Sequence, residues 1–192
     1  MKLRVFQPQE LNPFEKEDIK SLSITKETSD EIVEELGKEC TGCGHCCTID
    51  SGILFEEDVT RIADFLQIPR DDFITTYLEE HERFHTKCWK LKQIKQPARP
   101  YGRCILLTND NKCAVHEVKP RYCKLLSTAS KHGQQLAVWF ALNHFVNPND
   151  PESIRQWATY LKTHPTIPGG ELGELVPDKE TLQKILSYER LY

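Results

Sequence analysis

Half of the eight cysteines in this chain lie within eight residues, at positions 40–47, where the sequence is CTGCGHCC. The thiolate is the form of cysteine that binds metals, and soft thiolates favour zinc and iron over magnesium or calcium. Two residues between successive thiols let one tight turn present both sulfurs to one ion. Gly44 follows the second cysteine and can adopt a positive φ without steric cost, so backbone amides can point at sulfur. The segment therefore predicts a metal site, around which the rest of the fold is arranged.

A second group of cysteines follows in a basic, turn-rich stretch and consists of Cys104, Cys113 and Cys123. Residues 104–107 and 113–116 flank the turn sequence Asn-Asp-Asn, and this pattern predicts a β-hairpin. Pro120 favours the first turn of a helix that carries Cys123, and thiols near a helix N-terminus ionise more easily. The hairpin and the helix start would each supply sulfur to one place.

Length and composition indicate how many domains the chain forms and in which compartment we expect it. A chain of 192 residues suits one domain with a terminal extension, and 39% hydrophobic residues predict a thin core. A metal would help to hold its irregular parts. The first residues contain no apolar run typical of a signal peptide, and no stretch could span a bilayer. We therefore expect a cytoplasmic protein without membrane contact, whose cysteines are ligands or core residues rather than disulfides.

The net charge of -4 hides a strong asymmetry along the chain. Residues 1–85 carry 9 basic and 20 acidic side chains, whereas residues 86–131 carry 11 basic and 2 acidic side chains. The positive block coincides with the second cysteine group. Either its lysines and arginines offset anionic thiolates, or they form a phosphate-binding surface. We favour the first interpretation, and expect no nucleic-acid partner, because aromatic residues are few there and no nucleic-acid fold signature is present.

Hydrophobic periodicity predicts a predominantly helical α+β fold with a small, irregular β-hairpin and cysteine-cluster region stapled by metal. Helices are expected over residues 28–37, 56–68, 71–78, 135–145, 151–161 and 178–186, and short strands over residues 2–6 and 87–95, while residues 53–55 are a short apolar run. We expect three parts: an N-terminal arm (1–27), a metal-binding domain (28–130) and a helical C-terminal extension packed on it (131–192).

One further motif spells a zinc-protease signature. Residues 81–85 read H-E-x-x-H, which on a helix places both histidines on one face with the glutamate as base. Glu79 and Glu80 precede it and suit a surface, Arg83 places a positive charge inside it, and no third ligand is evident. We interpret the segment as a charged helix end with two exposed histidines.

The cysteine pattern as a whole resembles the CxxCxxCC family, the YkgJ-type cysteine-cluster proteins. The resemblance rests on Cys40-x2-Cys43-x2-Cys46-Cys47, on Cys104-Ile-Leu-Leu, and on the stretch from Lys112 to Lys124, KCAVHEVKPRYCK. It spans about residues 37–127. His116 stands where the family usually has tyrosine, Lys119 and Lys124 replace arginine, and a downstream Cys-Pro-Gly-Ile of many members is absent.

The resemblance implies a domain that chelates zinc or iron. Its ligand positions carry over to Cys40, Cys43, Cys46, Cys47, Cys104, Cys113 and Cys123. Seven thiols exceed the four that a tetrahedral zinc takes, so either two metals share them or some pack as buried thiols. The spacing of the first three cysteines also matches ferredoxin-type [4Fe-4S] sites. Cys46 and Cys47 are adjacent and would reach one mononuclear ion together only with difficulty, but could serve two adjacent metals.

Two functions are compatible with this reading. The first is a metal-binding protein whose cysteine cluster is structural or serves metal handling. The alternative is an iron–sulfur enzyme, because some family members are similar to flagellin lysine N-methylases, or a redox protein. No glycine-rich cofactor loop is visible. Cys88 lies outside the pattern and is interpreted as a buried hydrophobic residue, and His45 and His116 as neighbours of the ligands. The identity of any protein partner does not follow from the sequence.

Overall fold

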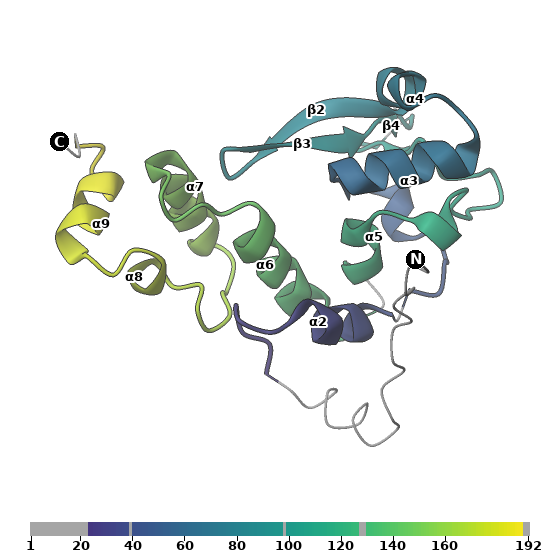
Figure 1. Cartoon of the computed structure of the whole chain (residues 1–192). Coiled ribbons are helices and arrows are strands. Elements are labelled where there is room, and N and C mark those ends of the chain that lie inside the picture. The colour runs from purple at the N-terminus through teal and green to yellow at the C-terminus, as the bar shows by residue number, and fades with distance from the viewer. Residues whose placement is uncertain (1–22, 39, 98, 127–129, 190–192) are drawn as a thin grey trace, which may run out of the picture.

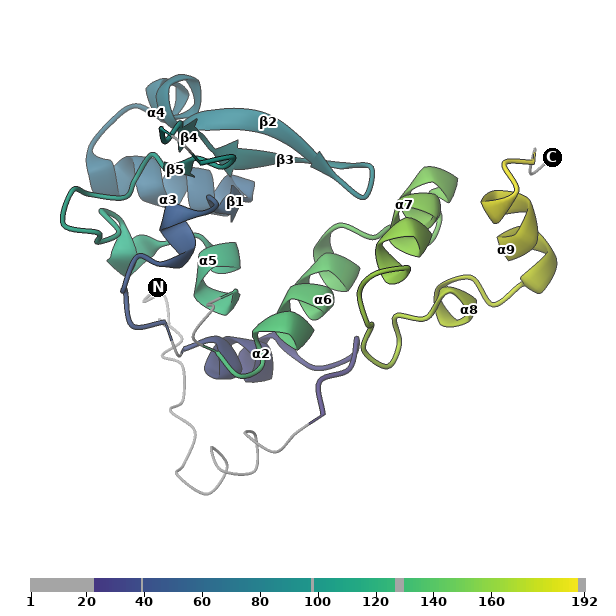
Figure 2. The same cartoon turned by 180° about the vertical axis from the view of Figure 1, so that it is seen from behind.

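The computed structural model describes residues 23–38, 40–97, 99–126 and 130–189. It confirms an α+β fold in which helices make most of the regular structure (Figures 1 and 2). The helices are α2 (Asp30–Gly37), α3 (Glu56–Leu66), α4 (Arg70–Tyr77), α5 (Arg121–Leu125), α6 (Gly133–His144), α7 (Pro151–Leu161), α8 (Leu172–Leu175) and α9 (Lys179–Leu186). The predicted strand over residues 2–6 and most of the N-terminal arm lie outside the described residues.

The predicted helix starts are confirmed where an acidic residue caps the first turn. Asp150 accepts a hydrogen bond from the backbone amide of Glu152 at 3.0 Å, and Pro151 occupies the first position of α7. Asp178 accepts from the amide of Thr181 at 3.0 Å and so begins α9. The short helix α8 lies between the predicted helices over residues 151–161 and 178–186, where the sequence predicts no helix.

Antiparallel strands form two small sheets. The first sheet has the order β1 (Ile53–Leu54), β3 (Thr86–Leu91), β2 (Leu78–Arg83), and the second pairs β4 (Gln93–Ile94) with β5 (Arg103–Cys104). The predicted strand over residues 87–95 is thus divided between two sheets. The predicted hairpin from Cys104 to His116 is present but short: Leu107 and Cys113 form an antiparallel bridge, and the Ala114 amide donates to the Leu106 carbonyl at 2.9 Å. Cys104 pairs with Gln93 instead.

The H-E-x-x-H segment is a strand and a turn, so the prediction of a helix end was wrong. His81 lies in β2 and pairs with Cys88 of β3. Phe84 and His85, with φ of 49° and 62°, make the tight turn that connects the two strands. In a strand, residues four apart do not adopt the one-turn spacing that lets two histidines hold one zinc ion.

Two hydrophobic cores divide the molecule. The first core joins α2 and α5 to the C-terminal helices and contains Leu36, Leu125, Phe140 and Trp157. The second lies under the first sheet, between α3, α4 and the segment from Cys104 to Val115. In Figures 1 and 2, α5 lies between the sheet with α3 and the row of α2, α6 and α7. The second cysteine group straddles the cores, because Cys104 and Cys113 belong to the second core and Cys123 lies on α5.

The turn between β2 and β3 is fastened to α7 by a histidine. His85 Nδ1 lies 2.6 Å from Asp150 Oδ2, and the His85 amide donates to Gln156 Oε1 at 3.0 Å. The hydrogen bond and charge of Asp150 raise the pKa of His85 above its usual 6.5. This link joins the sheet to the C-terminal helices.

We expect Asp150→Asn to lower the pKa of His85 to its ordinary range. Asparagine keeps the cap of α7 but removes the negative charge. Because the folded pKa of His85 is raised, its contribution to stability is present below pH 6.5 and is lost as the pH rises through the folded pKa. The melting temperatures of wild type and variant should therefore differ most at acidic pH and converge at alkaline pH. Titration of His85 by NMR gives the pKa directly, and an unchanged value would contradict this link.

Candidate metal centre

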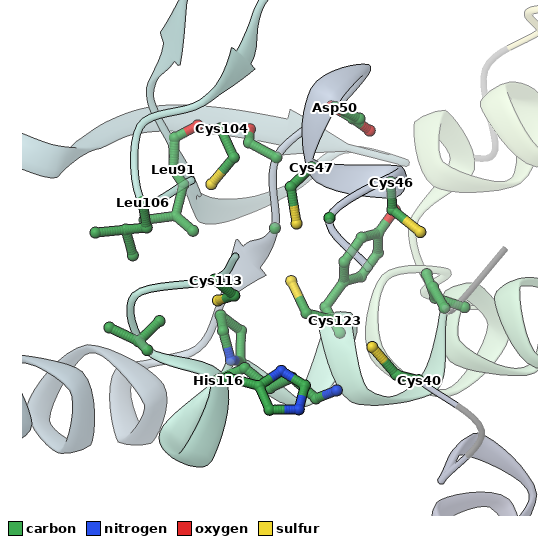
Figure 3. A pocket seen from close by; sticks show the side chains of 18 of the residues that line it. Cys40, Cys46, Cys47, Asp50, Leu91, Cys104, Leu106, Cys113, His116 and Cys123 are labelled. Atoms are coloured by element: carbon green, nitrogen blue, oxygen red, sulfur yellow. Dashed lines mark hydrogen bonds between the residues drawn. The ribbon is translucent and has the colours of Figure 1, made fainter. Parts of the chain in front are cut away.

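All seven cysteines that the family resemblance marks as ligands line a single cavity of about 250 Å³. They come from three stretches of the chain that are distant in sequence, and Figure 3 shows the sulfurs of six of them around the cavity. They are Cys40, Cys43, Cys46, Cys47, Cys104, Cys113 and Cys123. All eight cysteines of the chain are thiols rather than disulfides. The structure thus places the sulfurs together as the sequence predicts, whereas their role as ligands stays a prediction.

Two glycines shape the first cysteine segment. Gly42 and Gly44 both have a φ of 73°, which a residue with a side chain rarely adopts. A Cβ added at Gly44 would lie 2.2 Å from the carbonyl oxygen of Asn111, so the loop packs closely on the turn of the second cysteine group. The next residues form the short 3₁₀ helix η1 (Cys46–Thr48). The glycines therefore let the first cysteine segment curl against the second.

Glutamine side chains of β4 and of the loop that follows it hold η1 and the residues after it in place. Gln96 Nε2 donates to the Thr48 carbonyl at 2.8 Å, and Gln93 Nε2 donates to Asp50 Oδ1 at 3.2 Å. Ser51, which is buried, donates to the Leu91 carbonyl at 2.6 Å. The segment that carries Cys46 and Cys47 is thereby attached to β3 and β4.

The three later cysteines are positioned by different elements. Cys104 ends β5, Cys113 forms the bridge with Leu107, and Cys123 lies in α5. Gly52 allows α5 to approach, because a Cβ there would lie 2.3 Å from the Cys123 sulfur. Sequence reasoning missed Gly52, whose only signal is a glycine before a short apolar strand.

Burial keeps several of these thiols neutral in the absence of a metal. Desolvation, followed by the neighbouring thiols, raises the pKa of Cys47 to about 12. Desolvation likewise raises the pKa of Cys104 to about 11 and that of Cys123 well above its ordinary value. A bound cation would reverse this effect, because a coordinating thiol is deprotonated.

Backbone amides already point at two of the sulfurs. The amides of Leu106 and Gly52 donate hydrogen bonds to the Cys104 thiol, and the amide of Val115 donates to the Cys113 thiol. Each hydrogen bond lowers the pKa of its thiol, but burial raises that pKa by more. Hydrogen bonds of this kind orient and stabilise thiolate ligands in metal sites.

The donor set fits zinc or iron in kind and number, since it consists of soft sulfur ligands in excess of four. Within the described ranges, no group of three or more His, Cys, Asp or Glu side chains is close enough to hold one metal ion. The thiols therefore face a common cavity without standing at bonding distance. Binding of a cation has to draw the sulfurs inward, which is the coupling of metal binding to folding seen in small metal domains.

The basic block contributes little charge to the cavity. Lys119 is the one lysine or arginine among the residues that line it, and its charge lowers the pKa of Cys113 and Cys123 against burial. Two other residues of the block bind acidic partners from the first part of the chain. Arg121 contacts Asp30 at 2.8 Å, and Lys90 contacts Asp50 at 3.0 Å. Some basic side chains of residues 86–131 thus form ion pairs with acidic side chains of residues 1–85.

Cys88 does not line the cavity, whereas His45 and His116 do. Cys88 packs against the first hydrophobic core and donates weakly to the His81 carbonyl at 3.5 Å. His45 and His116 line the cavity and are exposed. The ring of His116 lies against Gly42, where an added Cβ would be 3.3 Å from its Cε1.

We expect His81→Ala to leave the metal content of the purified protein unchanged. His81 pairs with Cys88 across two strands, and it does not line the cysteine cavity. Metal analysis by mass spectrometry on the wild type and the variant checks this expectation. Loss of one equivalent of zinc in the variant would revive the protease-like interpretation.

The CxxCxxCC family model, described as a "Putative zinc- or iron-chelating domain", matches residues 39–140, which is more than half of the chain. The chain belongs to the CxxCxxCC family. The matched region contains all seven cysteines of the cavity. It also extends through most of α6, so the family domain takes in part of the helical region that the sequence assigns to a separate extension.

A curated relative of this CxxCxxCC protein is an uncharacterized protein of Methanocaldococcus jannaschii. It is 29% identical over 97 residues, which cover 50% of this chain and 47% of the relative. The chain thus spans about half the length of the curated relative that it matches. No solved structure matches the chain significantly. None of the helices within the described residues combines the length and apolar character needed to cross a membrane.

Proposed function

We propose that this protein binds zinc or iron through the thiolates of the cysteine cavity, and that the bound metal holds the middle of the chain together. The observation that carries the proposal is the convergence of seven thiols from residues 40–47, 104–113 and α5 on one cavity. Thiols scattered as ordinary core residues would not be expected to gather from distant segments in this way. The family match supports the same metals.

The position of the cavity supports a structural role for the metal. Cys47, Cys104 and Cys113 belong to or pack against the second hydrophobic core, whereas Cys123 lies on α5, whose Leu125 is in the first core. A metal held by both sets would therefore join the two cores. This cross-link would compensate for the low hydrophobic content of the chain.

Metal handling is the second role that the site supports. The exposed Cys43 and the exposed His45 and His116 give the cavity a solvent-facing side. The chemistry that a bound ion would supply is soft Lewis acidity toward sulfur and nitrogen donors.

Lysine N-methylase-like or redox activity with a [4Fe-4S] cluster rests on the family resemblance alone, without support from a specific contact. We further propose that the protein works in the cytoplasm, where its thiols stay reduced.

Metal analysis of the full chain purified without oxygen tests the proposed function. We expect zinc or iron bound to the protein, detected by mass spectrometry after desalting, in an amount that falls when cavity cysteines are replaced. The mass spectrum identifies the metal, and a brown colour in addition identifies an iron–sulfur cluster, since Zn²⁺ is d¹⁰ and gives no colour. Protein that binds neither metal after anaerobic loading would contradict the proposal.

A further inference from the structure

The side chains of the adjacent Cys46 and Cys47 point in different directions. In Figure 3 the Cys47 sulfur points toward those of Cys104 and Cys123, whereas the Cys46 sulfur points away from them. Both residues lie in η1, where consecutive side chains are rotated by about a third of a turn. The peptide between them is therefore a boundary between two groups of sulfurs.

The inner group consists of Cys47, Cys104, Cys113 and Cys123. Figure 3 shows their four sulfurs facing one another across the cavity. Each comes from a different local structure: η1, the end of β5, the isolated bridge and α5. The amide hydrogen bonds described above reach Cys104 and Cys113, which belong to this group. Four sulfurs are the number that a closed tetrahedral zinc site requires, and two of them already have amide partners.

The outer group consists of Cys40, Cys43 and Cys46, spaced three residues apart. Cys43 is exposed, and Cys40 and Cys46 are half-buried. In Figure 3 the sulfurs of Cys40 and Cys46 lie on the side of the cavity opposite Cys104 and Cys113. Gly42 and Gly44, both with positive φ, lie between these cysteines and let the loop bend sharply at two points. Three sulfurs leave one of four tetrahedral positions open.

We propose that the seven cysteines form two thiolate sites: a closed site of Cys47, Cys104, Cys113 and Cys123, and an open site of Cys40, Cys43 and Cys46. The open site takes an exchangeable soft divalent cation, such as zinc or ferrous iron, with its fourth position available to water or an external ligand. This inference rests on the proposed function. It assigns the structural role to the closed site and metal handling to the open site.

Zinc retention in matched cysteine variants tests the division. The full chain is purified without oxygen, loaded with zinc, desalted and challenged with EDTA. We expect the wild type to bind about two equivalents, of which EDTA removes one quickly and the second only on unfolding. Cys43→Ser should halve the zinc content, lose the quickly removed ion and keep its melting temperature. Cys113→Ser should lose the retained ion and melt at a lower temperature, and Cys88→Ser is the control that should keep both ions.

Each alternative outcome has a distinct meaning. If Cys43→Ser loses all zinc or melts as early as Cys113→Ser, the seven thiols form one shared centre and the division is wrong. If Cys43→Ser keeps all its zinc, the open site does not exist. Because Cys43 is exposed, its variant is expected to fold even where Cys113→Ser does not, and circular dichroism verifies this. Wild-type protein that binds no zinc or iron would instead overturn the proposed function itself.

Discussion

We expect Cys123→Ala to release bound metal and to lower the melting temperature by about 10 °C. A ligand loss at a structural metal site belongs to the changes that cost more than about 3 kcal/mol, and a chain of this size loses about 2–4 °C per kcal/mol. Metal analysis by mass spectrometry and thermal unfolding followed by circular dichroism measure the two effects.

Cys123 is chosen because it lies on the opposite side of the cavity from the second core. It belongs to α5, which contacts α2, α6 and β1, whereas Cys104 and Cys113 are attached to the second core. Without its sulfur a metal would be held by the second core alone. The two cores would then be joined by packing and by contacts such as the hydrogen bond of His85 with Asp150.

Cys88→Ala is the matched control. Cys88 is also a half-buried thiol whose pKa is raised by burial, but it does not line the cavity. Its replacement removes one sulfur from the edge of the first core and should cost about 1 kcal/mol without changing the metal content. Equal metal loss in the two variants would mean that the ligand assignment is wrong.

The helices of this fold could be predicted because local signals determine them. The acidic start of α3 and the caps Asp150 and Asp178 precede regular apolar stripes, and each gives a helix in the structure. The cysteine cavity was predictable for a related reason. Cysteine spacing specifies which sulfurs belong together even though it says nothing of how the intervening chain folds.

Strand pairing could not be predicted in the same way, because it depends on residues distant in sequence. The chain passes from α4 at Tyr77 directly into β2 at Leu78, so Leu78 reads as one more residue of the helical stripe. The turn at Phe84 and His85 has two positive φ values but lacks the glycine or asparagine that usually marks it. Pairing of β2 with β3 decides the conformation of the H-E-x-x-H segment, and no local pattern shows it.

The same limit applies to the second cysteine group. Residues 104–107 and 113–116 form a hairpin near its turn, around the Leu107–Cys113 bridge, but Cys104 pairs with Gln93 of another strand. The approach of α5 to Gly52 is likewise a contact between segments about 70 residues apart, which no local pattern encodes. Spacing thus identified the sulfurs, while tertiary contacts determine how they face one another.

The close contact of α5 with Gly52 gives the second prediction. We expect Gly52→Ala to weaken metal binding by about 10–100-fold, although the variant keeps all seven cysteines. The added Cβ would lie 2.3 Å from the Cys123 sulfur, so the thiol must rotate away. Gly52 has no positive φ, and its backbone accepts alanine without strain. The metal-free protein can accommodate the rotated thiol in the cavity, and its melting temperature should change by only about 2–4 °C, the equivalent of about 1 kcal/mol.

Gly173→Ala is the matched control for this substitution. Gly173 lies in α8, and an added Cβ there would have no atom within 4 Å. It should keep full metal affinity and gain slightly in stability from the better helix propensity of alanine. Competition with a chelator measures the affinity of each variant, and unfolding of the metal-free protein separates stability from binding. If Gly52→Ala binds metal as tightly as Gly173→Ala, the Cys123 sulfur does not contact the metal, and the cross-link between the two cores fails with it.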